Sequence, residues 1–267
     1  MGKQDTHFAA SLRPPAIVFN PMGRSRFLIV CDHASNHMPA AYGALGLSAI
    51  ERLMHIAWDP GALAVSKKLS ALLDAPLVQS TNSRLLVDPN RGHDAKDLIP
   101  EISEATPIPG NADISAEERA ARIAKFHTPY HKAIAALLDA RAARGIESIL
   151  VAMHSFTPVY HGAQRPWPVG LIHGADTGFT QALFDALKAD APEMNVGWNE
   201  PYAARQGIYY TMDLHADQRG LHGTMVEIRH DEILTPAGVT DWTERMARCL
   251  TRLLATLPST PASSPIS

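Results

Sequence analysis

Cysteine is nearly absent from this sequence of 267 residues, which contains only Cys31 and Cys249. The two lie far apart along the chain, and Cys31 closes an apolar run in which a free thiol is usually buried. Two such cysteines do not indicate the disulfide framework of a small secreted domain. We therefore expect a protein that works in a reducing cytoplasm.

Long apolar runs and an excess of one charge are also lacking. No stretch approaches the roughly 20 apolar residues needed to cross a bilayer, and the N-terminus lacks the continuous apolar core of a secretory signal. The formal net charge is -3, with acids and bases interspersed along the chain. This pattern gives no electrostatic surface for nucleic acid or an anionic membrane. We expect a soluble, cytoplasmic protein whose partner is a small molecule.

Several common catalytic motifs are missing. The sequence contains no Gly-x-Ser-x-Gly, no Gly-x-Gly-x-x-Gly, no phosphate-binding loop ending in Gly-Lys-Ser/Thr and no His-Glu-x-x-His. A nucleophilic Cys31 with His33 nearby is the remaining covalent mechanism, but a cysteine at the end of a buried run is more simply part of the core. A different kind of site has to be sought.

Apolar runs of strand length alternate with amphipathic segments of helical length. The clearest strands are 26–31, 148–153 and 224–229, and Ser115 with Glu118 forms a capping pair for a helix to about Arg144. Such alternation predicts an α/β fold in which a single mixed, largely parallel sheet carries helices on both faces. The other expected elements are strands at 76–80, 84–88 and 167–173, helices at 61–75, 177–190 and 240–257, a short helix after the Ser48–Glu51 capping pair, and a long loop over 89–114.

The length fits one α/β domain. Residues 1–25 show no sustained periodicity, and we expect them to form a loosely ordered N-terminal segment. The folded domain then covers 26–257, and the Ser/Pro-rich residues 258–267 form a flexible tail. We find no internal repeat.

Polar side chains follow two of the predicted strands. His33 comes just after the first, and His154 just after the second. Because sites in open α/β sheets form at the carboxyl ends of strands, we expect the two histidines to meet there. Together with Asp59 they would form the ligand set of one catalytic zinc ion that keeps a coordination position open. Glu227, inside the strand 224–229, is then the expected general base.

Each of these residues also has a structural interpretation. A histidine at a strand end more often makes a structural hydrogen bond, and an aspartate before proline, such as Asp59, is a favoured helix N-cap. The spacing leaves ligand and cap open for Asp59. Glu227 could instead pair with Arg229, which shares its face of the strand.

Residues near the ligands are assigned supporting roles. His37 stands four residues after His33, but Pro39 favours a loop there. We therefore expect His37, Asp32 and Asn36 to contact the ligands or the substrate from behind rather than to bind the metal.

Arginines form a second group of candidates. Arg84 and Arg91 flank an apolar run, and guanidinium groups bind carboxylates in a bidentate geometry. We expect these two to hold an acidic substrate, with further contacts from Asn90, Ser155 and Arg229. Most surface arginines are structural, so this assignment depends on where the chain places them.

Eight segments, taken together and in order, resemble the N-formylglutamate amidohydrolase (N-formylglutamate deformylase) family. The resemblance spans residues 31–231 and implies a zinc-dependent hydrolase with a phosphorylase/hydrolase-like fold related to zinc carboxypeptidases. It also implies cleavage of the formyl amide of N-formyl-L-glutamate in histidine breakdown. The segments are CDHASNHMP, HIAWDPGA, NSRLLVDPNR, the pair Tyr130-His131, MHSFTP, RPWPVG, NEPY and VEIRHD.

The same order of site residues is similar to that of zinc N-acetylmuramoyl-L-alanine amidases. This similarity favours Asp59 as the third ligand and Glu227 as the base. The sequence departs from familiar family members at the first histidine, where DHASN stands in place of PHSG. Two alternatives stay open: a zinc amidase or carboxypeptidase acting on another N-acyl amino acid or peptide, and a non-catalytic protein that binds acidic metabolites.

Overall fold

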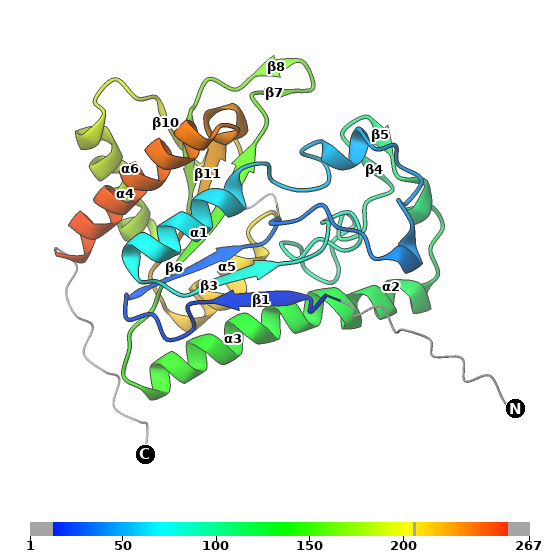
Figure 1. The fold of residues 1–267 in the computed structure, drawn as a ribbon, viewed down its shortest axis with the longest axis horizontal. Coiled ribbons are helices and arrows are strands. Elements are labelled where there is room, and N and C mark those ends of the chain that lie inside the picture. Colours follow the sequence, from blue (N-terminus) through cyan, green and yellow to red (C-terminus); the bar gives the residue numbers. More distant parts are fainter. Residues whose placement is uncertain (1–12, 205–206, 256–267) are drawn as a thin grey trace, which may run out of the picture.

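A seven-stranded sheet forms the centre of the molecule (Figure 1). The computed structural model describes residues 13–204 and 207–255, and the strand order is β1-β3-β2-β6-β11-β9-β10. The four strands from β3 to β11 are parallel, whereas β1 is antiparallel to β3, and β9 is antiparallel to β11 and parallel to β10. The predicted mixed, largely parallel sheet is confirmed. The strands are β1 Ala16–Phe19, β2 Phe27–Cys31, β3 Leu77–Ser80, β6 Ile149–Phe156, β9 Val169–Ile172, β10 Val196–Trp198 and β11 Gly223–Arg229.

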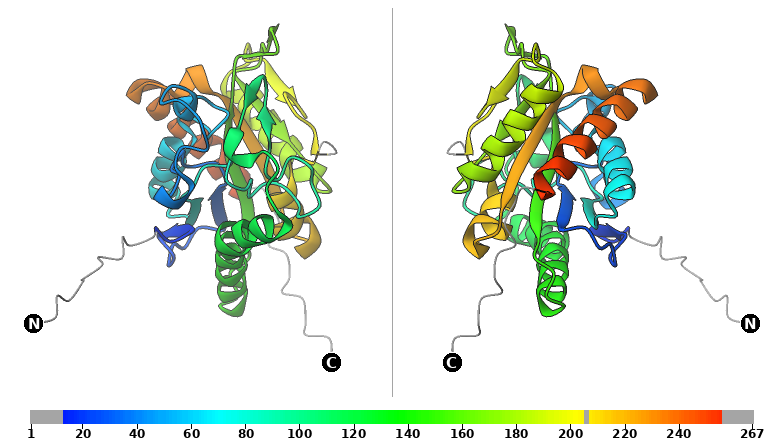
Figure 2. Two further views of the ribbon diagram at one scale, coloured as in Figure 1. Left: turned by 90° about the vertical axis from the view of Figure 1, so that its right-hand side faces the viewer. Right: turned by 90° about the vertical axis from the view of Figure 1, so that its left-hand side faces the viewer.

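Helices cover both faces of the sheet because its central strands are apolar on both sides. Successive side chains of a strand point to opposite faces, so Ile29 of β2 belongs to the core shared with α1, α4 and α6, and Val30 to the core shared with α3 and α5. Figures 1 and 2 show α3 on the side of the molecule away from α1, α4 and α6. The helices are α1 Ala62–Leu73, α2 Ala116–Arg122, α3 Thr128–Ala143, α4 Thr177–Asp190, α5 Tyr210–His215 and α6 Pro236–Leu254.

The long helix predicted from the Ser115–Glu118 pair is present. Ser115 Oγ accepts a hydrogen bond from the backbone N–H of Glu118 at 3.2 Å, as a capping residue does. The helix runs through α2 and α3, but a π-helical turn, Ile123–His127, separates the two. A π turn adds a residue to the turn and so changes which side chains share a face of the helix.

One predicted strand is wrong. Residues 84–86 form a turn, in which Leu86 N–H donates to the carbonyl of Ser83 at 3.1 Å, and residues 87 and 88 have no regular structure. The apolar side chains of Leu85 and Leu86 are buried in a small separate core with Leu45 and Ile108. Short apolar runs of this kind do not distinguish a strand from a buried loop.

Short elements account for the other differences from the sequence prediction. The segment predicted as a short helix has one 3-10 turn, and the long loop over 89–114 contains a hairpin. Strand β1 lies within residues 1–25, which were predicted to be loosely ordered, whereas the predicted tail 258–267 lies outside the described residues. The short elements are β4 Ile102–Ser103, β5 Thr106–Pro107, β7 Val159–Tyr160, β8 Ala163–Gln164, and the 3-10 turns Ala40–Tyr42, Glu51–Leu53, Pro109–Asn111, Asp217–Arg219 and His230–Ile233.

Within the described part of the chain, none of the helices combines the length and apolar character needed to cross a membrane.

Candidate metal centre and active site

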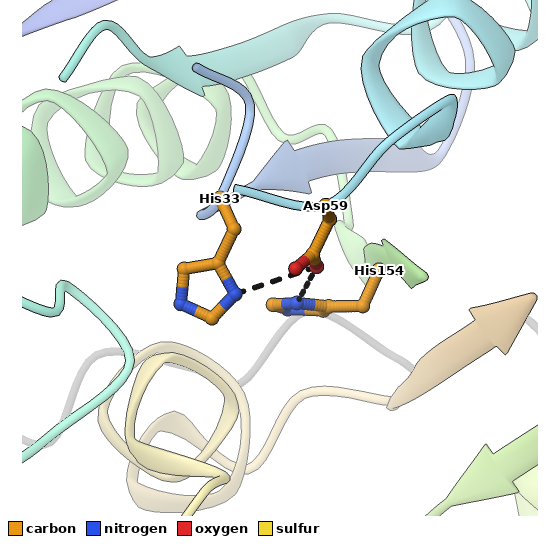
Figure 3. Close-up of side chains that lie close together, drawn as sticks. All are labelled: His33, Asp59 and His154. Atoms are coloured by element: carbon orange, nitrogen blue, oxygen red, sulfur yellow. Dashed lines mark hydrogen bonds and ion pairs between the residues drawn. The ribbon is translucent and has the colours of Figure 1, made fainter. Parts of the chain in front are cut away.

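Three side chains meet at the carboxyl end of the sheet: His33, Asp59 and His154 (Figure 3). His33 follows β2, His154 lies near the end of the neighbouring strand β6, and Asp59 precedes α1. Asp59 Oδ2 lies 3.3 Å from His33 Nδ1 and 2.9 Å from His154 Nδ1. All three residues are buried, and one nitrogen or oxygen atom of each lies within 4.8 Å of the others. The arrangement could hold a metal ion.

The surroundings of the two imidazoles fit a metal. His33 Nε2 donates to Asp88 Oδ1 at 2.7 Å, and His154 Nε2 donates to Asp32 Oδ2 at 3.1 Å. A carboxylate behind each ring leaves Nδ1 to face Asp59, fixes the orientation of the ring and raises its basicity as a ligand. Two imidazole nitrogens and one carboxylate oxygen are a donor set suited to zinc with an open position.

The carboxylate of Asp59 faces the two histidines and does not cap a helix. Gly61, with φ of 83°, occupies the N-cap position of α1, while Asp59 Oδ2 accepts the backbone N–H of Ser155 at 3.2 Å. Burial by itself would raise the pKa of Asp59, but His33 and His154 hold it below its usual range. The carboxylate is therefore ionised and available to a cation.

Glu227 lies beside this group. It occupies β11 directly opposite His154 of β6 and is 4% exposed. Its Oε2 has no hydrogen-bond partner among the described residues, an unusual state for a buried carboxyl oxygen. Burial raises the pKa of Glu227 to about 7. A carboxyl group with a pKa near neutrality can both accept and release a proton under physiological conditions.

Arg84 and Asp88 form the next layer of contacts. Arg84 Nη2 donates to Asp88 Oδ2 at 2.6 Å, and its Nη1 lies 3.2 Å from His33 Nδ1 and 3.8 Å from Asp59 Oδ1. Burial would lower the pKa of Arg84, but Asp88 and Asp59 more than offset this and raise it. Arg84 therefore brings a permanent positive charge to the site.

A cavity of about 230 Å³ opens onto these residues. Arg91 reaches it with its Nε bonded to Asp97 Oδ2 at 2.6 Å, and Asn90 is held by the backbone N–H of Thr211 at 3.0 Å. Residues of the hairpins β4–β5 and β7–β8 also line the cavity; Figure 1 shows where the two hairpins lie in the fold. The residues lining the cavity that the sequence predicted for the site are His33, Asp59, Arg84, Asn90, Arg91, His154, Ser155 and Glu227.

Other predicted residues lie elsewhere. The guanidinium of Arg229 bonds Asp231 at 2.8 Å and Glu232 at 3.1 Å, and neither acid lines the cavity. Arg229 shares a strand with Glu227, but its position at the end of β11 turns it toward the following 3-10 turn. Arg229 itself is also absent from the residues that line the cavity, so the structure does not bring it together with the other candidate residues.

Asp32, Asn36 and His37, which were expected to support the ligands, make different contacts. Asp32 is buried against His154 and also accepts hydrogen bonds from Tyr130 and Thr211, at 2.6 and 3.0 Å. Asn36 instead donates to the carbonyl of Arg52 at 2.9 Å. His37 likewise belongs to the loop, and its carbonyl accepts the backbone N–H of Ser83. Only Asp32 contacts the His/Asp group among the three.

The sequence did not single out Asp88 or Tyr202. Asp88 lies between Arg84 and Arg91 in the sequence, and its Oδ1 accepts a hydrogen bond from His33. Tyr202 lines the cavity, its hydroxyl accepts a hydrogen bond from Arg165 Nη1 at 3.0 Å, and burial raises its pKa to about 12, so it stays a hydroxyl. The one signal for Tyr202 was its place in the segment NEPY.

This site lies at the carboxyl edge of a mostly parallel α/β sheet, where sites of open α/β proteins form. Residues 25–234 match the model of the N-formylglutamate amidohydrolase family, and the chain belongs to this family. The resemblance predicted from the eight segments is thereby confirmed, and family membership supports an amidohydrolase activity on a small molecule.

Several solved structures are similar to this fold. Gene product Atu2144 from Agrobacterium tumefaciens is 37% identical, with a TM-score of 0.85 over 90% of this chain and 96% of its own. An N-formylglutamate amidohydrolase from Ralstonia eutropha JMP134 is 17% identical, with a TM-score of 0.68 over 91% of this chain and 98% of its own, and thus shares the fold. No curated protein matches the sequence.

Proposed function

We propose that the protein is a zinc-dependent hydrolase that converts N-formyl-L-glutamate and water to formate and L-glutamate. The observation that carries the proposal is the buried group of His33, Asp59 and His154 with the carboxyl of Glu227 beside it, all on one small cavity. Membership of the amidohydrolase family supports the same reaction. The reaction would then belong to histidine breakdown in the cytoplasm.

The donor atoms of His33, Asp59 and His154 would hold one zinc ion per chain. Bound there, zinc would polarise the formyl carbonyl and lower the pKa of a water molecule toward about 7. Asp88 and Asp32 would keep the two imidazoles oriented through their Nε2 atoms.

Glu227 would move the proton that the reaction requires. As the water oxygen bonds to the formyl carbon, Glu227 takes a proton from the water, and it then delivers this proton to the amide nitrogen as the C–N bond breaks. The second proton of the water passes from the formic acid product to the released amine, so the products are formate and the ammonium group of glutamate. The pKa of about 7 suits both steps, because the group must be ionised first and protonated later.

Arg84 and Arg91 would bind the carboxylates of the substrate. Each guanidinium bonds an aspartate, Asp88 and Asp97 respectively, which fixes its direction at the cavity wall. Asn90, Ser155 and the hydroxyl of Tyr202 would add polar contacts. A cavity of about 230 Å³ lies at or below the small end of ligand pockets and favours an N-acyl amino acid over a peptidoglycan fragment.

A formate-release assay tests the proposal most directly. Purified protein is loaded with zinc and assayed on N-formyl-L-glutamate, with and without a chelator, beside a panel of other N-formyl and N-acetyl amino acids. We expect formate release that the chelator abolishes and zinc restores. Preference for another member of the panel would move the substrate assignment, and binding without turnover would favour the non-catalytic alternative.

The role of Glu227 is tested by Glu227→Gln, which keeps the shape and removes the proton acceptor. We expect zinc content to stay near one per chain and turnover to fall by about 10²–10⁴-fold, the usual contribution of general acid–base catalysis. Glu232→Gln is the matched control. Glu232 lies just beyond the same strand and bonds Arg229, so this variant should keep its activity. Full turnover in Glu227→Gln would remove the residue from the mechanism.

A further inference from the structure

The loop from Asp88 to Arg91 brings three residues to the cavity without the support of a regular element. Asp88, Asn90 and Arg91 all line the cavity, and the backbone of this loop is buried. Buried peptide groups need hydrogen-bond partners, and two histidines supply them for two of the carbonyls of this loop. His131 Nε2 donates to the carbonyl of Pro89 at 2.8 Å, and His127 Nε2 donates to the carbonyl of Arg91 at 2.9 Å.

The two histidines face the loop from one helical segment. They stand four residues apart, a spacing that places side chains on the same face of a helix. His127 ends the π-helical turn Ile123–His127, and His131 lies in the first turn of α3. Such π turns occur frequently at functional sites, where they redirect side chains. Both rings are buried, with 1% and 7% exposure.

A second histidine stands behind each ring. Because a carbonyl oxygen can only accept, Nε2 of both rings must carry hydrogen, and in a neutral imidazole Nδ1 is then an acceptor. His131 Nδ1 accepts from His215 Nε2 at 3.0 Å, and His127 Nδ1 accepts from His93 Nε2 at 3.2 Å. Two histidine pairs, His215 with His131 and His93 with His127, thus each donate one hydrogen bond to a carbonyl of the loop.

Burial keeps the rings of His127, His131 and His215 neutral. It lowers the pKa of His127, His131 and His215 to about 4 each, so at neutral pH each ring has one donor and one acceptor nitrogen. The direction of the hydrogen bonds in both histidine pairs is then fixed, and the carbonyls of Pro89 and Arg91 each receive one.

We propose that His127 and His131 are positioning residues of the active site, which hold the Asp88–Arg91 loop through the carbonyls of Arg91 and Pro89, and that His93 and His215 fix their tautomers. The consequence for substrate binding rests on the function proposed above, because it requires Asn90 and Arg91 to contact the substrate. The consequence for the loop itself is independent of any substrate.

Paired substitutions separate the loop-holding donor from the bulk of the ring. The side-chain amide nitrogen of glutamine lies about where Nε2 lies in histidine, whereas that of asparagine lies near Nδ1. We expect His131→Asn and His127→Asn to raise KM for N-formyl-L-glutamate about tenfold with little change in kcat, as for a lost hydrogen bond to a buried group. His131→Gln and His127→Gln should restore KM. His222→Asn, a histidine bonded to Asp176 away from the cavity, is the control.

Hydrogen exchange measures the loop without any substrate. In His131→Asn we expect the amides of residues 88–98 to exchange about tenfold faster than in the wild type, while those of 149–156 in β6 keep their rate. His131→Gln should exchange as the wild type does. Equal KM values for the two variants of each histidine, or unchanged exchange in 88–98, would overturn the proposal. A wild type inactive on N-formyl-L-glutamate would instead overturn the proposed function and leave the exchange experiment decisive.

Discussion

Two groups of buried histidines contact the loop from Asp88 to Arg91, the first through His33 alone and the second through both of its rings, and they differ in what surrounds their nitrogens. At the candidate metal centre, Nε2 of His33 and of His154 each donates to a carboxylate. In the second group, Nε2 of His127 and of His131 each donates to a backbone carbonyl. The rings are buried to a similar extent, so the partners rather than the burial distinguish the two groups.

The protonation of the rings follows from these partners. Burial lowers the pKa of His154, but the hydrogen bonds to Asp32 and Asp59 outweigh it and raise the pKa well above the usual range. Burial also lowers the pKa of His131, and there it prevails, to a value of about 4. Neighbouring carboxylates thus favour a proton or a metal ion at the first group. The second group stays neutral and holds the loop in place through hydrogen bonds.

The largest expected effect comes from removing one imidazole from each group. His154→Ala should lose the metal and with it all measurable hydrolysis, because two ligands remain where a zinc site needs three. His131→Ala should keep a full complement of zinc. Metal content after dialysis and inductively coupled plasma analysis give the comparison. A fully loaded His154→Ala protein would remove this histidine from the ligand set, and metal loss in both variants would show that the two groups do not differ in this way.

A smaller effect is expected from the carboxylate behind a ligand. Asp32→Asn keeps the size of the side chain but removes the charge that orients His154, so zinc affinity should fall by about 10–100-fold, the usual cost of losing such a partner. Asp176→Asn is the matched control, because Asp176 also bonds a histidine, His222, at 2.8 Å but lies outside the cavity lining. Competition with a zinc-binding dye measures both. Equal affinities in the two variants would contradict the role given to Asp32.

Periodicity and capping were sufficient to predict most of the fold. The strand 26–31 is seen at Phe27–Cys31, and the capped helix from Ser115 begins where expected. The failure at 84–88 has a physical cause, since an apolar run satisfies a loop core as well as a sheet. The edge strand β1 was missed because it is short and only partly buried, with little alternation for a pattern to detect.

The site was predictable where chemistry follows strand order and unpredictable where side-chain direction decides. His33, His154 and Glu227 come from neighbouring strands, so topology alone brings them together. Arg229 lies on the same strand as Glu227, but its end position lets Asp231 and Glu232 capture it. The contact of Asp88 with His33 joins residues 55 positions apart through turns that no sequence period describes.

The subtlest difference between the two groups is expected in the pH dependence of stability. The pKa of His131 is about 4 in the folded protein and about 6.5 in the unfolded chain, so between these values the unfolded state binds more protons. The contribution of His131 to stability is therefore lost as pH falls from about 6.5 toward 4, and by pH 5 the loss amounts to about 2 kcal/mol. His131→Gln cannot titrate, so its free energy of unfolding relative to that of the wild type should improve by this amount between pH 7.5 and pH 5. Urea unfolding of both proteins in the presence of a chelator, which removes any linkage to metal, measures the difference.

An identical fall in the free energy of unfolding of both proteins would mean that His131 is not held neutral by its surroundings. The contrast with His154 would then fail.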